Sequence, residues 1–210
     1  MNDIVNKLFI LIFSMTLLQV VETPDEAFKR LKQGNHRFAT GKLLHPDRTQ
    51  ERRFSLREGQ SPYAVIVTCS DSRVVPEIIF DEGLGDFFVI RVAGNIVSVT
   101  ELESVIYAVD HLNPSIIVVI GHESCGAVDA VVQNHYQDIP AIAHLIQPSV
   151  KKAKDMKAAD LLKKSVELNA MNMRSLLMNV KTIGKRVRAE SLVVHGAYYN
   201  LQTGVVDFLD

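Results

Sequence analysis

Four short runs of β-branched and aromatic residues constrain the fold of this chain more than any other feature. They lie at residues 64–67, 87–92, 116–120 and 192–194. Each run is apolar at nearly every position rather than at alternate positions, which is typical of parallel strands covered on both faces. Because helical patterns separate the runs, the sequence predicts an α/β fold with a central, mostly parallel sheet of about four parallel strands flanked by helices.

Helical patterns connect the predicted strands. A capping box at residues 23–26, with proline at the first helical position, predicts an N-terminal helical arm of about 16 residues. Apolar residues recur at helical spacing over 100–112, and several helices joined by a charged linker at 151–160 are expected within 140–189. Residues 196–208 read as a hairpin, which adds an antiparallel C-terminal edge strand.

Length and composition favour one globular domain. The chain has 210 residues, of which 47% are hydrophobic, enough for one sizeable core. We assign residues 23–210 to a single domain and residues 1–22 to a separate apolar segment. Lysine and arginine number 23 against 24 acidic residues, so no basic field is available to attract nucleic acid. The charge pattern therefore predicts no nucleic-acid partner.

The N-terminal segment resembles a targeting signal. Residues 8–21 carry no charge and have about the length of a signal-peptide core, too short to cross a bilayer comfortably. This predicts export to the periplasm or secretion. Asp3 opposes Lys7, and no clear cleavage motif follows, so an uncleaved anchor, an apolar helix buried in an oligomer and a cytoplasmic location are the alternatives.

The only two cysteines each follow a predicted strand. Cys69 comes just after the run 64–67, and His122 and Cys125 come just after the run 116–120. The carboxyl ends of parallel strands share one edge of the sheet, where α/β proteins bind ligands. If the two strands are neighbours, the three side chains can converge. His122 and Cys125, three apart at the start of an expected helix, would face the same side.

Three readings of these residues are open. Two thiolates and an imidazole suit Zn²⁺, and three protein ligands leave the fourth position free, as in catalytic zinc sites. A Cys69 to Cys125 disulfide or a pair of buried thiols would also fit the spacing. Neither of these alternatives gives His122 a role, so we favour the metal site.

Asp71 and Arg73 follow Cys69 closely. One residue separates them, so their side chains lean to the same side and can form a bidentate ion pair. The carboxylate could either occupy the fourth metal position or pair with Arg73 and accept a hydrogen bond from a metal-bound water. The first arrangement would be an inactive state and the second an active state.

Taken together, these motifs resemble the β-class carbonic anhydrases. The resemblance rests on C-x-D-x-R at 69–73 and H-x-x-C at 122–125, and it extends over roughly residues 24–208, including the segments 60–62, 91–95 and 196–204. It implies an enzyme with one Zn²⁺ per subunit that reversibly hydrates carbon dioxide to bicarbonate and a proton. Its substrates would be the small molecules CO₂ and bicarbonate.

The resemblance also implies roles for individual residues. Zinc on Cys69, His122 and Cys125 would generate a hydroxide that attacks CO₂. Asp71, held by Arg73, would orient that hydroxide. Further residues would form the substrate pocket of the same or the neighbouring subunit, with an amide donor and two aromatic rings: Gln60, Phe88 and Tyr107.

One residue differs from part of the family and bears on the subclass to which the chain would belong. Members that bind bicarbonate at a non-catalytic site resemble one another in a tryptophan three residues before the first cysteine, and this chain has Ile66 there. This implies the open subclass, with Asp71 off the metal near pH 8, built as a homodimer or as a tetramer of dimers. Alternative functions are hydrolysis of carbon disulfide or carbonyl sulfide, and a zinc or redox protein without turnover.

Overall fold

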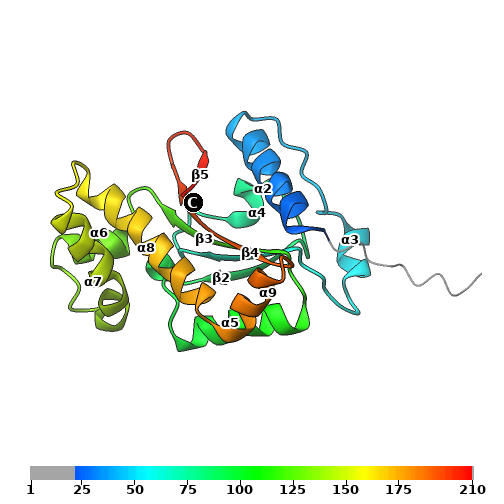
Figure 1. The fold of residues 1–210 in the computed structure, drawn as a ribbon. Helices are drawn as coiled ribbons and strands as arrows, with labels where there is room; N and C mark the ends of the chain where they lie inside the picture. Colours follow the sequence, from blue (N-terminus) through cyan, green and yellow to red (C-terminus); the bar gives the residue numbers. More distant parts are fainter. Residues whose placement is uncertain (1–21, 210) are drawn as a thin grey trace, which may run out of the picture.

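The computed structural model describes residues 22–209, which form one five-stranded sheet in the order β2-β1-β3-β4-β5 (Figure 1). The strands are β1 (Ala64–Thr68), β2 (Phe87–Arg91), β3 (Ile116–His122), β4 (Val193–Tyr199) and β5 (Val206–Phe208). The first four are parallel, and β5 pairs antiparallel with β4. The predicted α/β fold with an antiparallel C-terminal edge strand is confirmed.

The register brings the ends of the inner strands to one edge. Ala64 of β1 lies opposite Phe87 and Ile116, and Thr68 lies opposite Arg91 and Ile120. Strands β1 and β3 are buried at every position, as expected for central strands with both faces covered. Residues that follow β1 and β3 therefore emerge side by side.

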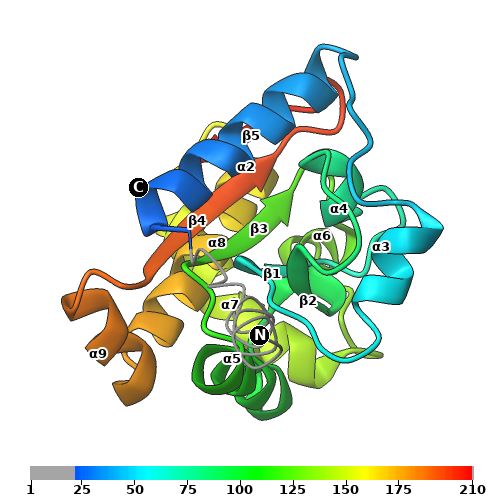
Figure 2. The same cartoon turned by 90° about the vertical axis from the view of Figure 1, so that its right-hand side faces the viewer.

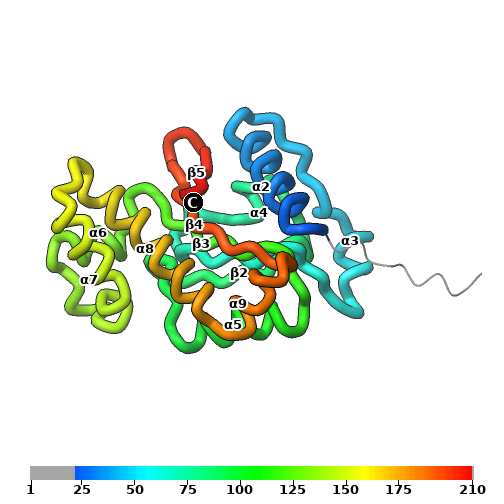
Figure 3. The backbone as a smooth tube through the Cα atoms, viewed as in Figure 1, coloured from blue at the N-terminus to red at the C-terminus, as the bar shows by residue number. Residues whose placement is uncertain are grey.

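Helices cover both faces of the sheet (Figure 2). On one face, Val65 and Val119 belong to a core cluster with residues of α5 (Val99–His111), α6 (Gly126–Val132), α7 (Pro140–Asp155), α8 (Leu161–Met178) and α9 (Lys181–Arg188). On the other face, Ile66 and Val118 share a cluster with residues of α2 (Pro24–Ala39) and α4 (Pro76–Ile79). Figure 3 shows α6 and α7 at one end of the molecule and α3 (Gln50–Ser55) at the other.

Two boundaries differ from the sequence prediction. The expected linker at 151–160 is wrong in its first half, because α7 continues to Asp155. Ala153 is buried there, and Lys151 pairs with Asp155 one turn later. The strand expected at 192–194 extends to Tyr199. Gly196, where the predicted hairpin begins, lies inside this strand, and an added Cβ there would be 2.5 Å from Met171 Sδ. The glycine lets α8 pack closely on the sheet.

The predicted targeting segment, residues 1–22, lies outside the described residues except for Glu22. Within residues 22–209, no helix combines the length and the apolarity that a membrane span requires.

Candidate metal centre

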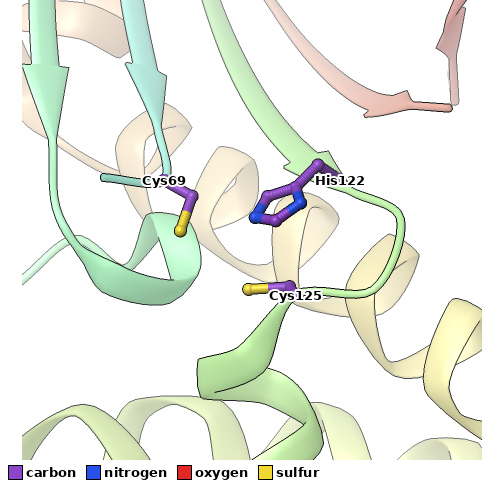
Figure 4. Close-up of side chains that lie close together, drawn as sticks. All are labelled: Cys69, His122 and Cys125. Atoms are coloured by element: carbon purple, nitrogen blue, oxygen red, sulfur yellow. The ribbon is translucent and has the colours of Figure 1, made fainter. Parts of the chain in front are cut away.

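Cys69, His122 and Cys125 meet at the carboxyl edge of the sheet (Figure 4). Cys69 follows β1, His122 is the last residue of β3, and Cys125 is the N-cap of α6. Their ligand atoms all lie within 4.8 Å of one another, and all three residues are buried. The structure thus brings together the three residues that the sequence nominated as metal ligands.

The local geometry of His122 and Cys125 differs from the prediction. They do not share a helix, because α6 begins only at Gly126. The residues between them form a turn in which Ser124 adopts the left-handed conformation, with φ of 53°. A strand end and a reversed turn, rather than the i, i+3 spacing of a helix, therefore aim both side chains at one point.

The imidazole of His122 is oriented for metal binding. Its Nδ1 lies 2.8 Å from the carbonyl oxygen of Glu123, which is an acceptor, so the proton resides on Nδ1. Its Nε2 is buried and has no hydrogen-bond partner among the described residues. A buried lone pair without a partner is costly unless a ligand satisfies it, and metal-bound histidines commonly have this second-shell hydrogen bond.

The turn after His122 is tied to the C-terminal hairpin. The Glu123 carboxylate accepts hydrogen bonds from the backbone N–H groups of Leu201, at 2.9 Å, and Gln202, at 3.3 Å. The Glu123 N–H donates to the carbonyl oxygen of Tyr199 at 2.9 Å. These contacts fix the backbone whose carbonyl orients the imidazole.

The two free thiols lie within 4.8 Å of each other and influence each other's ionisation. The neighbouring Cys125 thiol lowers the pKa of the Cys69 thiol, against the opposing effect of burial. The Gly94 amide donates to Cys69 Sγ, at 3.3 Å. The proximity of Cys69, together with burial, raises the pKa of Cys125. The pair thus stabilises one thiolate, and a divalent metal that binds both sulfurs would displace the remaining proton.

Asp71 is held beside this cluster by Arg73. Arg73 donates from Nε to Oδ1 at 2.9 Å and from Nη2 to Oδ2 at 2.7 Å, and its backbone N–H also reaches Oδ1. The Arg73 side chain is the main reason that the pKa of Asp71 lies well below its usual range. Asp71 Oδ2 is 4.0 Å from His122 Nε2. An ionised carboxylate, which can only accept hydrogen bonds, therefore borders the three candidate ligands.

Arg91 is a site residue that the sequence did not single out. It lies at the end of β2 and donates from Nε to the carbonyl oxygen of Cys69 at 3.1 Å and from Nη2 to that of Asp71 at 2.7 Å. These bonds clamp the backbone that carries both side chains. The available signal was the register, because Arg91 pairs with Thr68, the residue before Cys69.

The three predicted pocket residues lie away from the metal ligands of their own chain. Gln60 precedes β1, at the end opposite to Cys69. Phe88 lies opposite Val65, four residues before Cys69, which at about 3.3 Å per residue places it roughly 13 Å away along the strand. Tyr107 is half exposed on α5, with its ring 6.2 Å from that of Phe88.

Comparisons with known proteins agree with this geometry. Residues 64–206 match the model of the carbonic anhydrase family. The fold is similar to the solved structure of the β-carbonic anhydrase CcaA, with a TM-score of 0.70 and 28% identity over 87% of this chain and 95% of that one. The chain belongs to the β-class carbonic anhydrase family.

Two further relatives support the assignment. Carbonic anhydrase 2 of Mycobacterium tuberculosis is 38% identical over 194 residues, which cover 86% of this β-class carbonic anhydrase and 90% of the relative. A solved structure described as a tetrameric β-carbonic anhydrase from Sordaria macrospora is 26% identical, with a TM-score of 0.67 over 87% of this chain and 96% of that one. The predicted enzyme class, carbonic anhydrase, is therefore confirmed.

Proposed function

We propose that this carbonic anhydrase uses one Zn²⁺ per subunit to hydrate CO₂ reversibly to bicarbonate and a proton. The observation that carries the proposal is the convergence of Cys69, His122 and Cys125 within 4.8 Å, with the Asp71 carboxylate 4.0 Å from the imidazole. Two sulfurs and one imidazole nitrogen form a ligand set that suits zinc and leaves one position for the reacting water.

The residues present fit this metal. A tetrahedral zinc with bonds of about 2.0–2.3 Å separates its ligands by roughly 3.3–3.8 Å, which side chains already within 4.8 Å can reach by small rotations. The unpartnered Nε2 of His122 is the lone pair such a metal would take. When bound, zinc supplies Lewis acidity, which lowers the pKa of water from about 15.7 to roughly 7 in well-studied sites.

Asp71 would orient the attacking oxygen. Because Arg73 keeps the carboxylate ionised, it can only accept a hydrogen bond, and so it would hold the proton of the nucleophile away from CO₂ and point a lone pair at the carbon. Three contacts from Arg73 also hold Asp71 away from the metal position. This pairing supports the active arrangement that is expected for the open subclass.

A CO₂ hydration assay tests the proposed function. Stopped-flow hydration is measured for the purified protein with its zinc content determined on the same sample, beside the Asp71→Ala variant. We expect rapid hydration by wild-type protein that holds about one zinc per chain, and a loss of about 10- to 100-fold in the variant with its zinc retained. A protein with full zinc and no hydration activity would reject the proposal.

The substrate pocket would be completed by a second subunit. Strand β2 is an edge strand, with a row of main-chain groups that can pair with another copy. Large apolar side chains are exposed in segments next to it, including Leu84 at 47%, Val99 at 72% and Tyr107 at 50%. A homodimer, or a tetramer of dimers, joined at this edge would let Gln60, Phe88 and Tyr107 line the pocket of the neighbouring metal centre.

Substitution at the β2 edge tests the assembly. Val89 is half-buried on this edge strand, so Val89→Lys should place a charge in the interface and shift the protein to a monomer. We expect at least about tenfold less hydration activity at unchanged zinc content, because the pocket loses its second subunit. Light scattering and metal analysis measure the two quantities.

The matched control is Val205→Lys, at the opposite side of the sheet beside β5, where the valine is 39% exposed. It should leave both assembly and activity unchanged. A Val89→Lys protein that is monomeric and fully active would contradict the shared pocket.

A further inference from the structure

The turn Ala93–Asn95 packs tightly against the metal centre. Gly94 in this turn has φ of 73°, a conformation that favours glycine, and its N–H donates to Cys69 Sγ at 3.3 Å. A Cβ at this position would be 2.7 Å from Ile146 Cδ1 and 3.3 Å from Ala127 Cβ. The Gly94 backbone thus acts as a hydrogen-bond donor to a ligand sulfur, at a position where an added Cβ would displace Ile146.

A single buried amide fixes the other side of this residue. Asn169 on α8 is fully buried, and its Nδ2 donates to the Gly94 carbonyl oxygen at 2.8 Å. Its Oδ1 has no hydrogen-bond partner among the described residues. Burying an amide with part of its hydrogen-bonding capacity unsatisfied costs free energy. The bond to the Gly94 carbonyl is the one that offsets this cost for Asn169.

Gly94 therefore couples α8 to the ligand cysteine. Its carbonyl is held by Asn169 and its N–H points at Cys69, and only the φ and ψ angles of one glycine separate the two peptide planes. Glycine is the residue with the greatest backbone freedom, so this turn has little intrinsic stiffness. Without the amide of Asn169, the direction of the Gly94 N–H would be less well defined.

We propose that Asn169 is a positioning residue for the metal centre, which holds the Gly94 N–H on the Cys69 sulfur and so slows the loss of the metal. A fixed N–H donor stabilises the thiolate charge and restricts the rotation of the sulfur. Second-shell contacts of this kind are typically worth 10- to 100-fold in metal affinity. The inference rests on the proposed metal centre and is independent of CO₂ as the substrate.

Metal release from the Asn169→Ala variant tests the proposal. The zinc-loaded protein is mixed with a chromophoric chelator, and the rate of zinc release is compared with that of the wild type. We expect release about 10- to 100-fold faster. In protein reconstituted with Co²⁺, the sulfur-to-cobalt charge-transfer band should also shift, because the Cys69 sulfur loses a hydrogen bond. A purely structural role would leave this band unchanged.

Asn172→Ala is the matched control. Asn172 lies about one turn further along α8 and donates from Nδ2 to Ser149 Oγ on α7, also at 2.8 Å, rather than to the turn at Gly94. It should release zinc at the wild-type rate. The proposal is overturned if Asn169→Ala releases zinc no faster than Asn172→Ala and has the same cobalt spectrum.

A second variant allows the same test if Asn169→Ala does not fold. If Asn169→Ala does not fold, Asn169→Ser carries the same comparison, because serine is smaller than asparagine and too short to keep the bond to the Gly94 carbonyl. The same two outcomes then apply. Failure of the metal centre itself would be distinguishable, because the wild-type protein would then bind neither Zn²⁺ nor Co²⁺ at Cys69, His122 and Cys125.

Discussion

The His122→Ala variant should purify with little zinc and hydrate CO₂ more than about 10³-fold more slowly than the wild type. The imidazole is the only neutral ligand of the proposed set, and its Nε2 is buried without another partner. With two sulfurs remaining, the site has too few ligands to retain a tetrahedral metal and to lower the pKa of water. Metal analysis and stopped-flow hydration on one sample measure both effects.

His144→Ala is the control for this prediction. His144 is exposed on α7 and is not among the candidate metal ligands, so its removal should change neither zinc content nor rate. Circular dichroism checks that both variants are folded. If His122→Ala kept one zinc per chain and the full rate of hydration, the candidate metal centre would be wrong.

The Arg73→Ala variant should keep its zinc and lose about 10- to 100-fold of its activity at pH 7. Alanine keeps the backbone N–H contact to Oδ1 but loses both side-chain bonds that hold the Asp71 carboxylate, which lies only 4.0 Å from His122 Nε2. We expect the freed carboxylate to compete for the position that the reacting water needs. The Asp71 carboxylate is already close to the proposed metal position, and we expect Arg73 to keep it from binding there.

The activity deficit of Arg73→Ala should also change with pH in a definite direction. Arg73 lowers the pKa of Asp71 in the wild type, and an ordinary carboxyl group is also ionised at neutral pH, so Asp71 stays ionised throughout pH 6–9 in both proteins. Hydroxide, its competitor, rises tenfold per pH unit. The ratio of wild-type to variant rate should therefore fall as pH rises. Arg57→Ala, which removes an exposed pairing with Glu58, should give a constant ratio near one. A deficit in Arg73→Ala that does not change with pH would contradict the competition.

Much of the fold was predictable because the inner strands are buried on both faces. The runs in β1 and β3 are β-branched at most positions, and no other structure accounts for such short continuous apolar segments between helices. The sequence divided β4 between a strand at 192–194 and a hairpin that begins at residue 196, and it did not show that the two form one continuous strand. Gly196 lets Met171 pack closely against the sheet, a use that only the packed structure reveals.

The sequence could predict only those site residues whose positions are determined by the ends of strands. Cys69 and His122 follow directly from the parallel register of β1 and β3. The turn at Ser124 was missed, because a left-handed conformation in a serine has no sequence signature. Asn169 could not be found either, since it is one of several polar residues on α8 and only the packed structure shows which one reaches Gly94.

The anchoring of Glu123 by Leu201 and Gln202 bears on when the protein can acquire its metal during synthesis. The residues that hold the turn between His122 and Cys125 lie 78 and 79 positions later in the chain. Contacts between residues so far apart in the chain form late in folding, because packing must first offset the entropic cost of closing the loop between them. A nascent chain that has both cysteines and the histidine still lacks the hairpin that steadies them. Firm metal binding is therefore expected only after Leu201 and Gln202 have been synthesised and have packed against the turn, so metal supply would act on the folded hairpin rather than on early folding.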